Sequence, residues 1–166
     1  VWTRDKTKAN QFIEAFKNLD IDLHVASSCK ELASLSEIIV TTTPSKKPLL
    51  EFDWIIKGTH ITAMGSDAEQ KNELDPQMLK HCDQYVPDNQ LQTSVLGELH
   101  HALKQNIISS KEKFNELGDI ISDPSLGRKN KEDITICDLT GTGVQDTAIA
   151  RFAYNLCKTN NLGINI

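Results

Sequence analysis

One aspartate stands where chemistry is expected in this sequence. A turn glycine is followed by a short β-prone run from Ile61 to Met64, and Gly65 and Asp67 come shortly after the run. In an open α/β sheet, ligands bind just beyond the carboxyl ends of the strands. An aspartate there, beside a glycine that lets the backbone approach closely, is placed to hold or transfer a proton. The alternative is that Asp67 only caps a turn.

A run of hydroxyl side chains ends the preceding apolar segment. Thr41, Thr42 and Thr43 follow an Ile-Ile-Val run and are followed by Pro44, which stops a strand. Hydroxyls at the carboxyl end of a strand face the ligand crevice. The alternative is an ordinary strand terminus without a ligand.

A glycine-rich turn near the C-terminus resembles a dinucleotide fingerprint. Gly141 and Gly143 follow an apolar strand and open a helix, but Asp146 stands where the third glycine belongs. That glycine allows close helix–strand packing, which an aspartate does not. The turn is therefore predicted to line a pocket and cap a helix, and Asp146 suits the helix dipole.

The first residues look like the end of a strand, with Thr3 and Arg4 at its terminus. In dinucleotide folds an acidic residue at such a position holds the ribose of NAD, whereas arginine suits the 2′-phosphate of NADP. Thr3 and Arg4 would therefore favour NADP. The alternative for Arg4 is a solvated charge at the end of a strand.

Composition and charge narrow the class of protein. The 166 residues carry a net charge of −5, with 39% hydrophobic and 25% charged residues, as in a soluble globular domain. We expect no nucleic-acid partner, no membrane span and no signal peptide. The four cysteines are far apart in the sequence, a pattern that indicates reduced thiols in a cytoplasmic protein. We expect no metal site, because the adjacent His100 and His101 would point in different directions on a helix. We also expect Glu98, on the same helix, to be exposed, as most glutamates are.

Strand and helix patterns alternate, which favours an α/β fold with a largely parallel sheet and flanking helices. We expect strands at 1–4, 21–26, 37–43, 61–64, 84–86 and 134–139, and helices at 6–19, 30–35, shortly after 75, 91–103, 111–121 and 145–158. The chain opens inside a strand with no βα unit before it. We therefore expect it to be a fragment of a longer protein that lacks its first βα unit.

Several ordered motifs together resemble the ornithine cyclodeaminase/mu-crystallin family. They are Val1-Trp2-Thr3-Arg4, the run from Ser36 to Ser45, Gly58-Thr59-His60-Ile61 on to Met64-Gly65-Ser66-Asp67, Lys71, Glu73-Leu74-Asp75-Pro76, Gly97-Glu98-Leu99, and Ile134 to Gly141 with Gln145-Asp146. The resemblance implies a Rossmann module over residues 1–145 and a C-terminal helix, 146–166, that packs on an N-terminal dimerisation domain. The phosphate loop and the substrate-carboxylate clamp would lie outside this chain.

The resemblance also implies roles for individual residues. Asp67 looks like the catalytic acid/base and Thr140 like a substrate contact. The residues that resemble cofactor contacts are Thr3, Arg4, Thr43, Ala63, Met64, Gly65, Lys71 and Leu139. Many members carry serine where Leu139 stands, so a polar contact is lost there.

The implied activity is that of an NAD(P)-dependent oxidoreductase or cyclodeaminase acting at the Cα–N bond of an amino or imino acid, with NADP(H) favoured. The full-length protein would be a homodimer, and the isolated fragment would be inactive. The alternative is a non-catalytic, NADP-dependent binder of small ligands of the mu-crystallin type.

Overall fold

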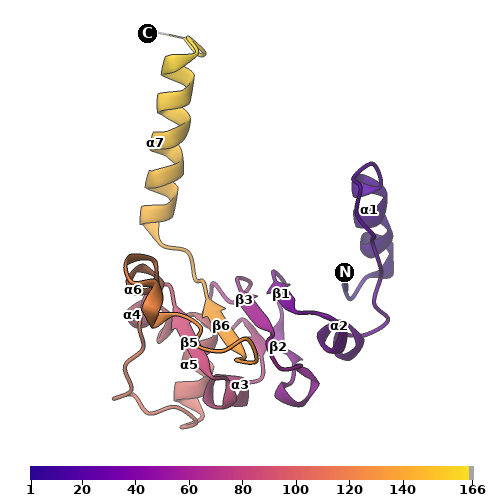
Figure 1. Cartoon of the computed structure of the whole chain (residues 1–166), viewed down its shortest axis with the longest axis vertical. Helices are drawn as coiled ribbons and strands as arrows, with labels where there is room; N and C mark the ends of the chain where they lie inside the picture. The colour runs from indigo at the N-terminus through magenta and orange to yellow at the C-terminus, as the bar shows by residue number, and fades with distance from the viewer. Residues whose placement is uncertain (165–166) are drawn as a thin grey trace.

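The computed structural model describes residues 1–164 and places a four-stranded parallel sheet at the centre (Figure 1). The strands are β1 (Ile38–Thr41), β3 (His60–Ala63), β5 (Gln84–Pro87) and β6 (Thr135–Asp138), in the order β1-β3-β6-β5. All neighbours are parallel, and the register aligns Ile39, Ile61 and Ile136 with Tyr85 across the sheet. The expected α/β fold with a parallel sheet is confirmed.

The core lies on one face of this sheet. Ile39, Ile61 and Ile136 are buried there with Met78 of α3 (Gln77–His81) and Leu99 of α5 (Gly97–Lys104). Strands β1 and β3 alternate buried residues with more exposed ones, as expected for strands that bury one face, whereas all four residues of β6 are buried. The other face is open over β1, where the side chains of Ile38 and Val40 are 69% and 55% exposed.

A second, two-stranded parallel sheet was not predicted. It pairs β2 (Lys46–Leu50) with β4 (Asn72–Leu74). The sequence gives little sign of either strand, because β2 opens with two lysines and a proline and β4 has only three residues between polar neighbours. Strand β4 matters for the site, since it carries Glu73.

The N-terminal part departs from the predicted strands. Residues 1–4 and 21–26 form no regular strand, although the two segments join through Ala26 N to Val1 O (2.9 Å) and Val1 N to His24 O (2.7 Å). Neither segment pairs with β1 in the described chain, and Figure 1 shows the N-terminal part lying apart from the sheet. Only these two hydrogen bonds join the segments, which is too few for a regular ladder between strands.

The helices follow the predicted order with shorter bounds. Helix α1 (Lys6–Phe16) ends before residue 19, and α2 (Cys29–Leu35) begins after Ser28, whose hydroxyl accepts the Glu31 N–H at 3.1 Å. The helix expected at 91–103 is two helices, α4 (Gln90–Thr93) and α5, separated where Gly97 adopts φ +71°. The helix expected at 111–121 is only α6 (Leu117–Ser122), with the short 3₁₀ turns η1 (Phe52–Trp54) and η2 (Pro124–Leu126) elsewhere.

Helix α7 (Gly143–Thr159) matches the predicted helix at 145–158 and rises from the end of β6 away from the body of the molecule (Figure 1). Its apolar side chains are exposed, with Ile149 at 62%, Phe152 at 64% and Leu156 at 52%. Asn165 and Ile166, the end of the predicted C-terminal segment, lie outside the described residues.

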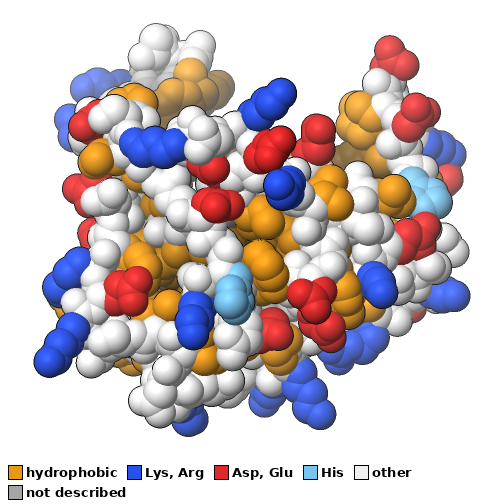
Figure 2. Space-filling view, turned by 60° about the horizontal axis from the view of Figure 1, so that its bottom comes forward, with side chains coloured by type: hydrophobic (Ala, Val, Ile, Leu, Met, Phe, Trp, Pro, Cys, Tyr) orange, Lys and Arg blue, Asp and Glu red, His pale blue; other side chains and the backbone are white. Residues whose placement is uncertain are grey.

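The surface carries both signs of charge. Figure 2 shows Lys and Arg side chains interspersed with Asp and Glu over one face of the molecule. Among residues 1–164, no helix combines the length and the apolar character needed to cross a bilayer.

Candidate active site

The polar strand ends meet at the carboxyl edge of the four-stranded sheet. Met64 N donates to Thr41 O at 3.0 Å, which ties the end of β3 to β1. Leu139 N donates to Ala63 O at 2.8 Å, which ties the end of β6 to β3. The sequence-predicted residues Thr43, Ala63, Met64, Gly65, Leu139 and Thr140 are therefore brought together on three adjacent strand ends.

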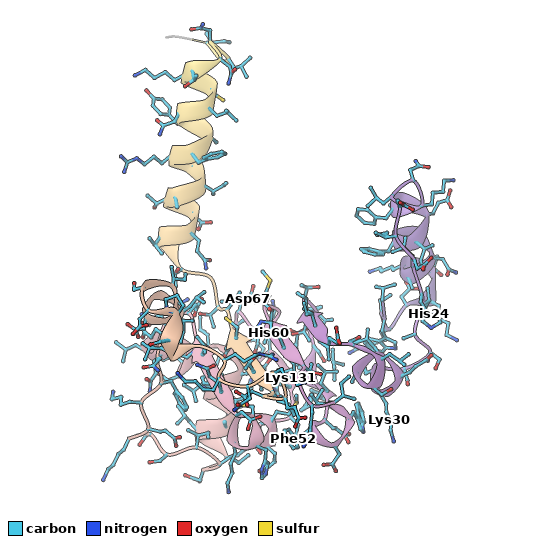
Figure 3. All side chains as sticks on the ribbon, viewed as in Figure 1. His24, Lys30, Phe52, His60, Asp67 and Lys131 are labelled. Atoms are coloured by element: carbon cyan, nitrogen blue, oxygen red, sulfur yellow. The ribbon has the colours of Figure 1, made fainter. Side chains whose placement is uncertain are left out.

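Asp67 begins the loop that leaves this edge. Its carboxylate forms an ion pair with Lys71, and the two side chains are 53% and 26% exposed. Figure 3 shows Asp67 near the side of the sheet from which α7 rises, whereas Phe52 and Lys131 lie on the opposite side. The structure thus joins the predicted acid/base directly to the predicted cofactor-contacting lysine.

The loop from Asp67 to Lys71 is closed by side chains beneath it. The carbonyl of Lys71 accepts from Ser66 Oγ at 2.5 Å and from His101 Nε2 at 2.6 Å. A carbonyl can only accept, so His101 is the donor in this bond. Burial lowers the pKa of His101, which favours the neutral imidazole that makes this contact. His101 was not predicted as a site residue.

The segment after β6 is fixed by an aspartate from the neighbouring strand end. Asp88 accepts from Thr140 N at 2.8 Å, from Thr140 Oγ1 at 3.0 Å and from Gly141 N at 3.0 Å. Gln92 Nε2 donates to Thr140 Oγ1 at 2.9 Å. The Gly141 turn then leads to Thr142, which caps α7 in a capping box with Gln145, in line with the predicted capping turn.

Thr3 and Arg4 line a hollow that they share with Thr43 and with none of the other predicted site residues. The hollow is lined by the N-terminal segment with Lys8 and Phe12 of α1 on one side and by residues 42–45 on the other. Thr43 therefore faces both the strand-end cluster and this hollow. The cationic and hydroxyl groups here are the donor set that a phosphate or ribose requires.

Three buried carboxyl groups lie beneath the strand ends, and sequence reasoning did not place them. Glu73 and Asp138 are fully buried and Glu98 is 1% exposed, so the expectation that Glu98 is a surface residue is wrong. Burial is the main cause that raises the pKa of Glu98 to about 8 and that of Asp138 to about 7. The nearby Asp138 charge adds to the rise at Glu98. The only local sign of this burial in the sequence is the glycine at position 97. In the structure Gly97 has a left-handed backbone, which turns the start of α5 toward Asp138.

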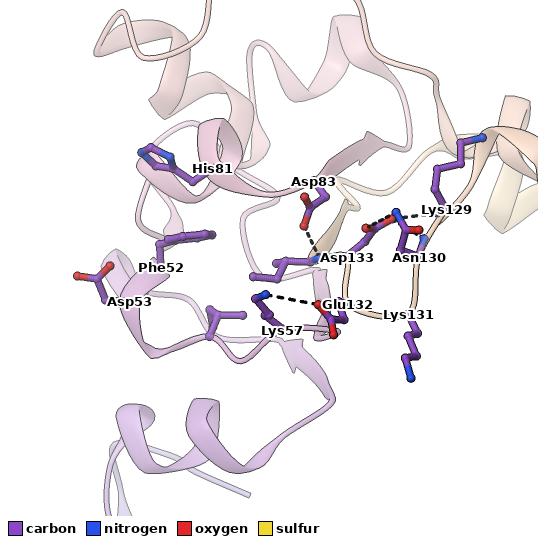
Figure 4. A pocket seen from close by; sticks show the side chains of 12 residues that line it. Phe52, Asp53, Lys57, His81, Asp83, Lys129, Asn130, Lys131, Glu132 and Asp133 are labelled. Carbon is purple, nitrogen blue, oxygen red and sulfur yellow. Dashed lines mark hydrogen bonds and ion pairs between the residues drawn. The ribbon is translucent and has the colours of Figure 1, made fainter.

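A second hollow lies at the opposite end of the sheet, between the η1 region and the loop before β6 (Figure 4). Three of its carboxylates have protein partners, and one of them, Glu132, pairs with Lys57. Asp133 accepts from the backbone of Lys129 and Asn130 at 3.0 and 2.8 Å, and Asp83 accepts from Ile134 N at 2.8 Å. These contacts stabilise the loop and give no sign of chemistry.

A parallel sheet with flanking helices and with its polar strand ends gathered at the carboxyl edge is the arrangement of a Rossmann-type α/β domain. Within that class, the chain belongs to the ornithine cyclodeaminase/mu-crystallin family, whose model matches residues 1–161.

Known relatives support this assignment. The chain is 46% identical over 165 residues to the "uncharacterized cyclodeaminase y4tK" of Sinorhizobium fredii, covering 98% of this chain and 50% of the relative. It is 35% identical to the alanine dehydrogenase of Archaeoglobus fulgidus, covering 95% and 48% of the two chains.

Solved structures agree with the fold. An archaeal alanine dehydrogenase dimer with bound NAD superposes with a TM-score of 0.89 at 32% identity, over 99% of this chain and 51% of that one. The Thermococcus litoralis Δ1-pyrroline-2-carboxylate reductase in complex with NADH and L-proline gives 0.92 at 25% identity, over 100% and 52%. The chain thus spans about half the length of the relatives it matches.

Proposed function

We propose that this chain is the cofactor-binding half of an NAD(P)-dependent enzyme that acts at the Cα–N bond of an amino or imino acid. The observation that carries the proposal is the position of Asp67, next to the three strand ends where such a domain holds its dinucleotide. The family and the names of the relatives, which are dehydrogenases, reductases and cyclodeaminases, support it.

The residues present fit part of a dinucleotide. Thr3, Arg4 and Lys8 would hold the ribose with its 2′-phosphate, and Thr43, Ala63, Met64 and Gly65 would contact the cofactor along the strand ends. Bound NAD(P) would supply the hydride chemistry. The preference for NADP rests on Arg4 and on the absence of an acidic side chain at Thr3, whereas the solved relatives described above hold NAD or NADH.

Asp67 is the proposed proton carrier. Its carboxylate would accept a proton from the water or side-chain amine that attacks the substrate imine, and would return it to the departing nitrogen. Lys71 would keep the carboxylate oriented toward the site, and Leu139 and Thr140 would border the substrate.

The proposed arrangement has two parts. Residues 1–145 would form the incomplete NAD(P)-binding domain, and residues 146–166, which contain most of α7, would pack on an N-terminal dimerisation domain. The exposed apolar side chains of α7 support this packing, as does the half-length match to the relatives. The complete protein would be a homodimer, and the 166-residue chain alone would be inactive.

The test is to supply the missing half. We would fuse the N-terminal half of the Sinorhizobium fredii relative to Val1 and assay amino acids and cyclic imines by nicotinamide absorbance, with NADPH and NADH compared. We expect turnover in the fusion, tighter binding of NADPH than of NADH, and weak or no binding of NADPH by the 166-residue chain. A clear calorimetric isotherm for NADPH with the chain alone would contradict the proposed division of the site.

Asp67→Asn in the same fusion tests the proton role. We expect turnover to collapse while NADPH binding is largely kept, because the substitution removes the ionisable group and little volume. Glu69→Gln, an exposed change in the same loop, is the matched control and should leave turnover unchanged. Near-normal turnover of the Asp67→Asn fusion would refute the assignment.

The second candidate function is a non-catalytic, NADP-dependent binder of small ligands. The ion pair between Asp67 and Lys71 favours it, because the contact with Lys71 accounts for the place of this carboxylate without any role in proton transfer. A relative at 29% identity is named a ketimine reductase mu-crystallin, and that name describes an enzyme. Tight NADPH binding by the fusion with no turnover on the whole panel would favour the binder.

A further inference from the structure

Glu73 joins the two strand ends that form the centre of the candidate site. Its Oε1 accepts the backbone N–H of Thr43 at 2.5 Å, and its Oε2 accepts that of Gly65 at 2.9 Å. The side chain of Glu73 is fully buried, the bond to Gly65 is buried as well, and the bond to Thr43 is partly buried. Hydrogen bonds from backbone N–H groups to a carboxylate are about twice as strong as neutral ones.

Gly65 has no room for a side chain because of this carboxylate. A Cβ at Gly65 would lie 2.4 Å from Cδ and Oε2 of Glu73 and 2.4 Å from the carbonyl oxygen of Thr43. Glu73, Thr43 and Gly65 are therefore packed as one unit. The glycine is required by the carboxylate beneath the strand ends.

A second carboxyl group holds the strand that carries Glu73. Glu98 accepts the backbone N–H groups of Glu73 and Leu74 at 2.8 and 3.1 Å, and the side-chain amide of Asn72 at 2.6 Å. Three donors from the three residues of β4 thus converge on one side chain of α5. This contact fixes β4, and with it Glu73, against the helix.

A third carboxyl group connects the start of α5 to the four-stranded sheet. Asp138, the last residue of β6, accepts from Glu98 N at 2.9 Å, Leu99 N at 3.2 Å and Tyr85 Oη at 2.6 Å. Leu139 and Thr140 follow Asp138 directly. The ends of β1, β3 and β6 are therefore linked through Glu73, β4, Glu98, the start of α5 and Asp138.

We propose that Glu73, Glu98 and Asp138 form a carboxyl brace that positions the three strand ends, with Glu73 as the positioning residue for Thr43 and Gly65. The inference rests on the proposed function only in assigning those strand ends to the cofactor. Glu73 does not touch the reacting atoms and acts through the backbone that would contact the dinucleotide. A carboxylate suits this place, because each of its oxygens receives an N–H donor, and an amide would turn its own NH₂ toward one of them.

Amide hydrogen exchange in the 166-residue chain tests the brace without any cofactor. In the unmodified chain, the Thr43 and Gly65 amides should exchange far more slowly than those of Glu69 and Gln70 in the exposed loop. Glu73→Gln should accelerate exchange at both amides by about tenfold or more, the loss expected for a charge-assisted hydrogen bond. The amide of Ala102 within α5 should keep its protection, and Glu69→Gln is the matched control.

Fast exchange of Thr43 and Gly65 in the unmodified chain would overturn the brace, even where Glu73→Gln fails to fold. Kinetic measurements on the fusion described above test the positioning role of Glu73. There Glu73→Gln should raise the KM for NADPH by about tenfold with a smaller change in kcat, whereas Asp67→Asn lowers kcat. Unchanged KM in a folded Glu73→Gln fusion would overturn the positioning role. Absence of NADPH binding in the unmodified fusion would refute the proposed function and leave the exchange result standing.

Discussion

The substitution Gly65→Ala tests the close packing of Gly65 against its neighbours most directly. The added methyl group would lie 2.4 Å from a backbone carbonyl oxygen and from two atoms of the fully buried Glu73 side chain. Because one of these neighbours is backbone, a rotamer change alone cannot relieve the contact. The end of β3 must therefore move away from β1, and Glu73 must also withdraw from its hydrogen bond to Gly65.

The expected cost follows from these two responses. Overpacking a well-packed site costs about 1–3 kcal/mol, and leaving the buried Gly65 N–H without its acceptor costs about 1–3 kcal/mol more. We therefore expect Gly65→Ala to lower the free energy of unfolding by about 2–6 kcal/mol, a large share of the stability of an ordinary domain.

Urea denaturation followed by circular dichroism measures this loss. The matched control is Gly118→Ala, since a Cβ at Gly118 in α6 meets nothing within 4 Å. That control should be neutral or stabilise the chain by about 0.5–1 kcal/mol, because alanine is the better helix former. In the Glu73→Ala background, Gly65→Ala should cost less, because two of its three close contacts are gone. A Gly65→Ala chain as stable as the unmodified one would refute the reasoning.

Two further predictions concern ionisable groups. The folded-state pKa values of Glu98 and Asp138 are raised to about 8 and about 7 from ordinary values of 4.5 and 3.8, so the folded chain holds protons that the unfolded chain has released. The free energy of unfolding should therefore fall as pH rises through these folded-state values, from about 7 to about 8, and urea titrations showing a rise would contradict this assignment. The thiols should also react in a fixed order, because Cys157 is exposed while burial raises the pKa of Cys82 to about 12 and that of Cys137 to about 11. Mass spectrometry after a short iodoacetamide pulse should find label on Cys157 well before the other two.

The sequence by itself determined the class of fold and the location of the strand ends. Apolar runs such as Ile38-Ile39-Val40 and Ile134 to Cys137 are typical of buried parallel strands, and their ends supplied Thr43, Gly65 and Leu139. The strand expected from residues 61 to 64 is confirmed within one residue at each end. Parallel connectivity then requires these ends to share one edge, whatever the details of packing.

Only the tertiary structure decided what lies beneath that edge. Glu73 and Glu98 are 25 residues apart, and Asp138 is 40 residues beyond Glu98, so no local pattern shows that their carboxyl groups share one buried network. A glutamate on a short helix is normally solvated, and it becomes a buried acceptor only when other segments offer unpaired N–H groups to it. Burial of this kind depends on which segments meet in space. The residues that face the site could thus be predicted from the sequence, whereas the buried carboxyl groups that hold them in place could not.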